Sequence, residues 1–178
     1  MSSVIWVAGP NAAGKTTALR RWKQHLQDKV HCVTADNNRE IDVTGEKMHR
    51  DPRWSGTMQE KQEILQELFD SDDPVPWIVE SCRTPPIPFA KRLYCVFTLT
   101  KGPAMARNLE ERCDKKGKRF KKEFWTPKRC HYESHDRQLR WIGKHEPICC
   151  KVLWVDKRED QWPRADHYVI QLAKRLHR

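Results

Sequence analysis

Long apolar runs, paired cysteines and internal repeats are all missing from this chain. No stretch approaches the roughly 20 apolar residues that cross a membrane, and no basic region with a signal-like apolar core opens the sequence. Seven cysteines, an odd number without regular spacing, indicate reduced thiols rather than a disulfide framework. These absences predict a soluble, cytoplasmic protein without a membrane partner.

Acidic residues are also scarce relative to basic ones. The 178 residues include 34 Lys and Arg against 24 Asp and Glu, a net charge of +10. Residues 101–144 alone hold fourteen Lys and Arg against six Asp and Glu. Such a segment favours a polyanionic partner, either nucleotide phosphates or a nucleic-acid backbone, although a solvated basic face would have the same composition. The length suits a single domain over residues 1–178.

A phosphate-binding pattern, G-x-x-x-x-G-K-T, occupies residues 9–16. An apolar run at 4–8 precedes it, and apolar residues at helical spacing follow it, as this loop requires. The pattern predicts ATP and Mg²⁺ as cofactors: the lysine reaches the outer phosphates, and the threonine hydroxyl holds the metal. The predicted nucleotide-binding residues are Gly9, Pro10, Asn11, Ala12, Ala13, Gly14, Lys15, Thr16 and Thr17.

Apolar runs alternate with helical patterns along the rest of the chain. Strands are expected at 4–8, 30–33, 77–79, 93–99 and 148–155, the last with Cys149 and Cys150 in the core. Thr57 and Glu60 predict a capping box before a helix. The alternation predicts an α/β fold, a five-stranded parallel sheet flanked by helices. Ligands of such sheets gather at the carboxyl ends of the strands.

Two carboxylates end predicted strands at that edge. Asp36 is the candidate general base for an accepting hydroxyl, and its alternative role is to cap the turn that follows it. Glu80 is expected to orient Mg²⁺ through a water, or to act as the base in place of Asp36. Arg39 and Arg83 each follow a carboxylate by three residues, so each would hold an acceptor phosphate or pair with that acid.

The basic segment, about 101–144, predicts a helical lid over this edge. Arg112 is the first choice for a lid arginine that stabilises the transferring phosphoryl group. The lysines and arginine behind it are expected to contact substrate: Lys116, Lys118 and Arg119. Most aromatic side chains of the segment are expected to pack against the core, whereas Phe124 and Trp125 stay open to stacking on bases. The Cys and His residues here lack paired spacing, which disfavours a zinc site.

The pattern resembles the P-loop nucleoside and nucleotide kinases, especially the thymidylate-kinase-like group. The matching parts are residues 9–17, Asp36, Glu80 to Arg83, and the lid region around Arg112. The resemblance implies a single P-loop kinase domain. Thymidylate kinases have an Asp-Arg pair at the end of the third strand; the different spacing of Glu80 and Arg83 argues against a free thymidine nucleotide as acceptor.

Within that group, the chain resembles small phage kinases in size, in its early loop and in its basic charge. Those enzymes phosphorylate the hydroxymethyl group of 5-hydroxymethyluracil in DNA, a step toward hypermodified thymines that resist restriction. The resemblance therefore implies a DNA-modifying kinase, located in the host cytoplasm if the chain is viral.

The sequence leaves three alternatives to that hypothesis. A nucleoside or nucleotide kinase would use the same core chemistry on a soluble acceptor. A polynucleotide kinase would phosphorylate 5′ ends whatever the base. A nucleotide-gated nucleic-acid-binding module would transfer nothing, and its only support is the positive charge.

Overall fold

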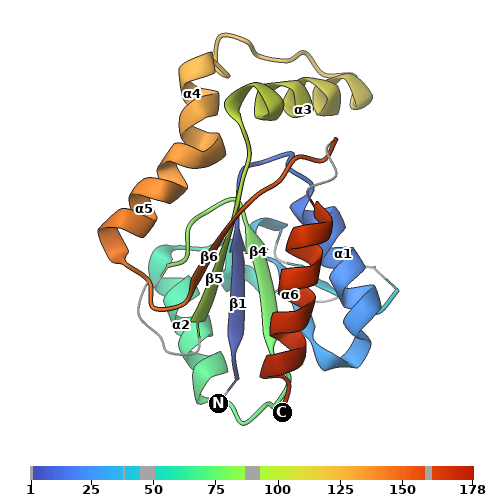
Figure 1. Cartoon of the computed structure of the whole chain (residues 1–178), viewed down its shortest axis with the longest axis vertical. Coiled ribbons are helices and arrows are strands. Elements are labelled where there is room, and N and C mark those ends of the chain that lie inside the picture. The colour runs from blue at the N-terminus through green and yellow to red at the C-terminus, as the bar shows by residue number, and fades with distance from the viewer. Residues whose placement is uncertain (1, 38, 45–50, 87–92, 159–161) are drawn as a thin grey trace.

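Six strands form one mixed sheet in the computed structural model of this chain (Figure 1). The structure describes residues 2–37, 39–44, 51–86, 93–158 and 162–178. The strands lie in the order β3-β2-β4-β1-β5-β6. They are β1 (Val4–Ala8), β2 (His31–Thr34), β3 (Arg39–Ile41), β4 (Trp77–Ser81), β5 (Leu93–Leu99) and β6 (Cys150–Trp154).

Helices connect the strands and cover both faces of the sheet. They are α1 (Lys15–Leu26), α2 (Met58–Asp70), α3 (Gly102–Lys115), α4 (Pro127–His131), α5 (Arg137–His145) and α6 (Trp162–Leu176). A π-helical turn, Tyr132–Asp136, joins α4 to α5, and short 3-10 turns lie at Gln27–Lys29, Ala35–Asn37 and Pro52–Ser55. None of the described helices is both long and apolar enough to cross a membrane.

Five parallel strands were predicted and are confirmed, but a sixth was missed. β2 pairs in parallel with β4, β4 with β1, β1 with β5 and β5 with β6. β3 is antiparallel to β2, with Ile41 opposite Cys32, and lies in a stretch where no strand was predicted. The prediction was wrong there because β3 has three residues, of which only Ile41 is buried, so it shows no alternating pattern.

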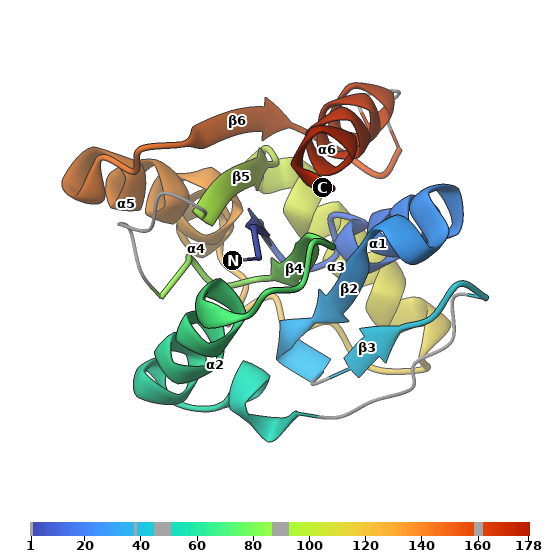
Figure 2. The ribbon, with the colours of Figure 1, turned by 90° about the horizontal axis from the view of Figure 1, so that it is seen from below.

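Each face of the sheet has its own apolar layer. Helices α1 and α6 cover one face (Figure 2), where the buried residues include Trp22 and Val169. Helix α2 covers the other face with Leu65 and Phe69, and Trp141 of α5 packs there against Phe97 of β5. Because successive strand residues point to opposite faces, strands covered on both sides are apolar throughout, as β1 is.

The expected core cysteines are not in the core. Cys149 is half-buried and Cys150 is exposed, in a strand shorter than predicted. The reason is topological: β6 is at the edge of the sheet, where an apolar sequence is no proof of burial. Val152 and Trp154 of the same strand are exposed as well.

The predicted capping box before α2 is confirmed. Thr57 Oγ1 accepts a hydrogen bond from the Glu60 backbone N–H at 3.1 Å. In return, Glu60 Oε1 accepts from the Thr57 backbone N–H at 3.2 Å. These bonds satisfy two amide groups that the first helical turn leaves without a backbone partner.

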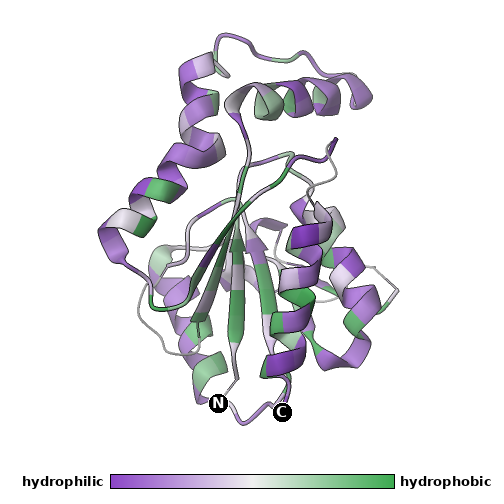
Figure 3. Cartoon of the chain, in the orientation of Figure 1, coloured by the Kyte–Doolittle hydropathy of each residue, from purple (hydrophilic) through white to green (hydrophobic). Residues whose placement is uncertain are grey.

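Helix α3 lies across the carboxyl end of the sheet, and α4 and α5 descend beside it (Figure 1). Helices α3, α4 and α5 together form an arm that is largely hydrophilic, whereas the central strands are apolar (Figure 3). Two contacts fix it to the sheet: the Thr100 N–H donates to Ser134 O at 3.2 Å, and Arg107 pairs with Asp156 at 2.6 Å. The basic segment therefore covers the edge where the strands end.

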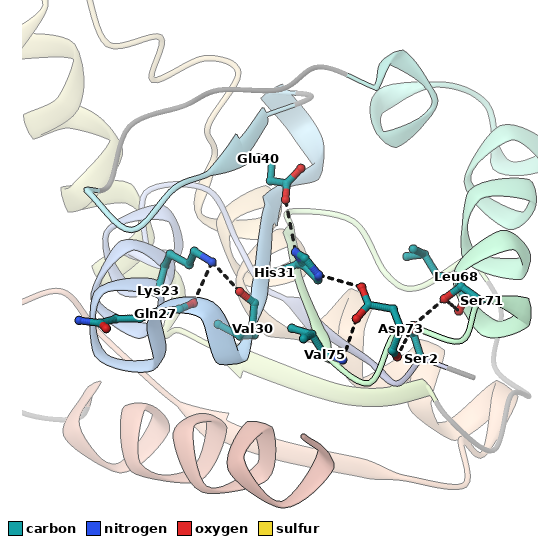
Figure 4. Close-up of polar contacts among 10 residues, drawn as sticks. All are labelled: Ser2, Lys23, Gln27, Val30, His31, Glu40, Leu68, Ser71, Asp73 and Val75. Carbon is teal, nitrogen blue, oxygen red and sulfur yellow. Dashed lines mark hydrogen bonds and ion pairs between the residues drawn. The ribbon is translucent and has the colours of Figure 1, made fainter. Parts of the chain in front are cut away.

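A polar network surrounds the start of β2, at the end of the strand away from the phosphate-binding loop (Figure 4). Lys23 is buried and donates to the carbonyls of Gln27 and Val30, at 2.9 and 2.6 Å, which ties the end of α1 to the start of β2. His31 contacts Asp73 through Nε2 at 2.9 Å and Glu40 through Nδ1 at 3.5 Å.

Two carboxylates therefore control the protonation of His31. Partial burial lowers its pKa, but the hydrogen bonds to Glu40 and Asp73 outweigh burial, so the pKa is raised. A histidine with a raised folded pKa adds stability that is fully present below its unfolded pKa of about 6.5. That stability is lost as pH rises through the folded pKa.

We therefore expect His31→Gln to lower the melting temperature by a few degrees more at about pH 5.5 than at about pH 9. Thermal unfolding followed by circular dichroism at both pH values measures this difference. His25→Gln, at an exposed position of α1, is the control and should show no such pH dependence. An equal loss for His31→Gln at both pH values would contradict an ionic role.

Candidate active site

The loop after β1 depends on two glycines. A Cβ at Gly9 would lie 2.1 Å from Thr98 Oγ1, so no larger residue fits beside β5. Gly14 has φ of 94°, in the left-handed region that favours glycine, and is the residue before α1. The loop therefore passes close to β5 and then directs the first N–H groups of α1 toward the space above the sheet.

Hydrogen bonds from side chains hold the backbone of the loop and the hydroxyl that follows it. Lys15 Nζ donates to Pro10 O at 2.7 Å, and Thr16 Oγ1 donates to Glu80 Oε1 at 2.8 Å. Trp162 Nε1, from α6, donates to Ala13 O at 2.9 Å. No pattern in the sequence indicated a role for this tryptophan, because a distant helix brings it to the loop.

A cavity of about 430 Å³ opens beside the loop, and we call it the P-loop cavity. Lysine and arginine side chains outnumber the two carboxylates in its wall. Its lining residues are Asn11, Ala12, Gly14, Lys15, Thr16, Thr17, Asp36, Asn37, Glu80, Arg112, Lys115, Lys116 and Lys157. A cationic cavity at a helix N-terminus is suited to binding phosphate groups.

A second cavity, of about 590 Å³, lies next to the first, and we call it the Arg83 cavity. Pro10 and Asn11 of the loop are part of its wall, and Asn11 lines both cavities. The other lining residues are Gly56, Thr57, Met58, Lys61, Cys82, Arg83, Thr84, Met105, Trp125, Arg129, Glu133 and Arg137. Four cations and one carboxylate give this cavity a positive balance.

Asp36 lies between the two cavities. Its Oδ1 accepts from Ser81 Oγ at 2.7 Å, and its Oδ2 accepts from the Cys82 backbone N–H at 2.8 Å. It lines the P-loop cavity, while Cys82 lines the Arg83 cavity. Each carboxylate oxygen keeps a further lone pair for another donor. The side chain is thus held in one orientation while it can still accept a further hydrogen bond.

The Cys82 thiol is not poised for nucleophilic chemistry. Burial, and next the Asp36 carboxylate, raise its pKa to about 11. A thiol with that pKa is protonated at neutral pH, and the thiolate is the reactive form. The Asp36 carboxylate, in contrast, keeps lone pairs open to another donor.

Sequence reasoning missed three cations of the Arg83 cavity. Lys61 of α2 is buried and donates to Gly56 O at 2.8 Å; burial, and next Arg83, lower its pKa. Arg137 donates to Cys82 O at 2.6 Å and pairs with Glu133 at 3.0 Å. Arg129 is the third. A signal existed for Lys61, whose spacing from Ile64 and Leu65 puts a charge on the core face of α2.

The predicted substrate residues divide between the two cavities and the surface. Arg112 and Lys116 line the P-loop cavity. Arg83 and Trp125 line the Arg83 cavity. Arg39 on β3, and Lys118 and Arg119 after α3, line neither of them. The first four therefore lie at the wall of a cavity, and the other three do not.

Arg107 and Arg112, both on α3, have different contacts. Arg107 pairs with Asp156, and Asn108 Nδ2 donates to the same carboxylate at 3.3 Å. Burial opposes ionisation of Asp156, but the bond from Arg107 and its other donors hold its pKa below the usual value. Arg107 therefore anchors α3, and Arg112, more than one turn further on, is left to line the P-loop cavity.

Thr16 and Glu80 fit Mg²⁺. Their oxygen atoms, 2.8 Å apart at the wall of the P-loop cavity, are the hard ligands that this ion prefers. Among the described residues, no three His, Cys, Asp or Glu side chains are grouped to hold a metal ion. Mg²⁺ in nucleotide sites is bound mainly by phosphate and water oxygens, with one or two protein ligands.

Comparison with known proteins identifies the fold. No protein-family model matches the chain, and no curated protein sequence matches it. A gluconokinase structure from Sinorhizobium meliloti 1021 has a TM-score of 0.53 and 11% identity, over 99% of this chain and 93% of that chain. A shikimate kinase structure from Bacteroides thetaiotaomicron has a TM-score of 0.49 and 16% identity, over 97% and 98%. At this low identity, the similarity establishes the fold alone: the chain shares the α/β fold of that gluconokinase.

Proposed function

We propose that this protein is an ATP-dependent kinase that phosphorylates a hydroxyl group on DNA. The acceptor that we assign is the hydroxymethyl group of 5-hydroxymethyluracil. The position of Asp36 carries the proposal, since this carboxylate lies between the phosphate-binding loop and a second cationic cavity. A loop that only bound nucleotide would need neither the second cavity nor a carboxylate at its entrance.

The P-loop cavity is the donor site in this proposal. The backbone N–H groups of residues 9–16 and Lys15 hold the phosphates, and Arg112, Lys115 and Lys116 offset the charge of the transferring group. Thr16 and Glu80 would hold Mg²⁺, which neutralises phosphate charge when it is bound. Glu80 is buried and accepts a hydrogen bond from Thr16, so we assign it to metal binding and not to proton transfer from the acceptor.

The Arg83 cavity is the acceptor site. A hydroxyl there attacks the γ-phosphorus, a new O–P bond forms, and the bond from phosphorus to the β–γ bridging oxygen breaks to release ADP. Asp36 accepts the hydroxyl proton and later gives it to water. The bonds from Ser81 and Cys82 keep the carboxylate aimed during this step.

Charge and aromatic side chains support a DNA acceptor. Lys61, Arg83, Arg129 and Arg137 suit phosphates of the backbone, and the Trp125 ring at the same cavity suits a base taken out of its stack. The net charge of +10 supplies the long-range attraction that a polyanion requires.

A soluble anionic acceptor is the second candidate, and the size of the cavity favours it. About 590 Å³ is within the range of pockets that enclose whole small molecules. The same cations would then bind a carboxylate or phosphate of a nucleotide or another small hydroxyl compound. Both candidates share the donor site and the base.

Transfer from γ-labelled ATP distinguishes the candidates. The acceptors are DNA with 5-hydroxymethyluracil, the same DNA with thymine, and free 5-hydroxymethyldeoxyuridine monophosphate; Lys15→Ala is the inactive control. Label on the modified base of DNA supports the proposal. Label only on the free nucleotide, or at the 5′ ends of both DNAs, contradicts it. No label on any acceptor, with ATP still bound, points to a binding module.

Removing the proposed base should slow transfer without loss of ATP binding. We expect Asp36→Asn to lower kcat by roughly 10²- to 10⁴-fold, because the amide cannot accept the proton. Steady-state kinetics and nucleotide titration measure the two effects. Glu80→Gln is the matched variant and should raise the Mg²⁺ concentration required. Full turnover in Asp36→Asn would remove this residue from the mechanism.

Arg83 should decide how tightly the acceptor binds. We expect Arg83→Ala to raise the acceptor KM by roughly tenfold or more, since a charge-assisted hydrogen bond contributes about 1.5–3 kcal/mol. The KM for ATP should not change, because the side chain lines only the Arg83 cavity. Lys29→Ala, an exposed change on another side of the molecule, is the control. An unchanged acceptor KM would place the acceptor elsewhere.

A further inference from the structure

A third concave surface lies on the outer side of α4, and we call it the α4 groove. Its volume is about 660 Å³, and it is lined by Phe124, Lys128, Arg129, His131, Tyr132 and Arg140, together with Thr126 and Asp136. The donor and acceptor chemistry described above uses only Arg129 of these residues. The groove thus requires an explanation of its own.

Exposed rings and cations alternate along the groove. Phe124 is 46% exposed and Tyr132 is 39% exposed. The Arg129 guanidinium lies 3.7 Å from the centre of the Phe124 ring, and the Arg140 guanidinium lies 5.6 Å from that of Tyr132. Each open ring therefore has a positive group beside it, the arrangement that binds a stacked base and its phosphate together.

The charge of the groove is positive as well. Asp136 is its only carboxylate and is paired with Arg140 at 2.9 Å, which leaves Lys128 and Arg129 without a carboxylate in the groove lining. An acidic peptide would satisfy the cations but would offer nothing flat to cover both rings. A single strand of nucleic acid supplies both features at regular intervals.

The groove adjoins the Arg83 cavity. Arg129 lines both of them. Trp125 lines the Arg83 cavity, and its ring meets that of Phe124 edge-on, with centres 5.1 Å apart and planes at 87°. A chain with one unit in the Arg83 cavity can therefore place the next units along the groove.

We propose that the α4 groove binds a single-stranded DNA segment flanking the nucleotide that enters the Arg83 cavity. Bases stack on Phe124 and Tyr132, and phosphates contact Lys128, Arg129 and Arg140. The proposal rests on the proposed function, because it extends the acceptor from one nucleotide to a strand. It gives the open rings of this hydrophilic arm a role that core packing does not supply.

Binding without ATP tests the groove separately from phosphotransfer. Fluorescence anisotropy measures the affinity of a labelled single-stranded oligodeoxynucleotide and of a matched abasic strand of equal length. Phe124→Ala and Tyr132→Ala should each weaken binding of the base-carrying strand by roughly tenfold, since base–aromatic stacking is lost while the net charge is kept. Neither variant should change binding of the abasic strand.

Controls separate stacking from damage to the fold. Phe124→Trp keeps a stacking ring and should keep the wild-type affinity, and Ile148→Ala removes an exposed apolar side chain outside the groove. Each variant is first checked by thermal melting. Equal affinity for both strands, or wild-type affinity in both alanine variants, would overturn the groove proposal. Absence of label on DNA in the transfer assay, with these binding losses intact, would overturn the proposed function alone.

Discussion

Asp36 connects the end of β2 to the turn after β4, and both cavities are built around this connection. Two hydrogen bonds, from Ser81 Oγ and the Cys82 N–H, hold one carboxylate. They also fix the turn whose next residue, Arg83, lines the second cavity. Because β1 lies between β4 and β5, the phosphate-binding loop emerges beside that turn. In the proposed mechanism, one side chain therefore sets where the acceptor hydroxyl lies relative to the bound phosphate.

The surplus of positive charge acts at the same edge. Cations from α2, α3, α4 and α5 converge on the two cavities, and their mutual repulsion is only partly relieved by Glu80, Asp36 and Glu133. Arg107 and Asp156 hold α3 in place against that repulsion. Anionic ligands would reduce the repulsion, so binding of donor and acceptor should also stabilise the arm over the sheet.

The sequence predicts those parts of the site that depend on a local motif or on the topology of a parallel sheet. The loop, Asp36 and Glu80 could be placed together because parallel strands end at one edge. Lys61, Arg129 and Arg137 could not, since three helices bring them together. The spacing of Lys61 marks a charge on the core face of α2, but it does not locate that charge at this site. Two features of the edge strands were missed for a related reason. β3 has too few residues for a periodic signal, and β6, a strand as predicted, is exposed although it has the sequence of a buried strand.

Phe124 and Trp125 show that a few residues around α4 shape both the Arg83 cavity and the α4 groove. They are adjacent in sequence, yet their perpendicular rings line different hollows, with Arg129 shared between them. The five-residue helix α4 fixes this division, and it is capped by Thr126, whose hydroxyl accepts from the Arg129 N–H at 3.2 Å. A shift of this short segment would move the walls of both hollows at once. In the proposed function, selection of the acceptor is therefore a property of the segment 124–132, while the chemistry of transfer belongs to the sheet edge beneath it.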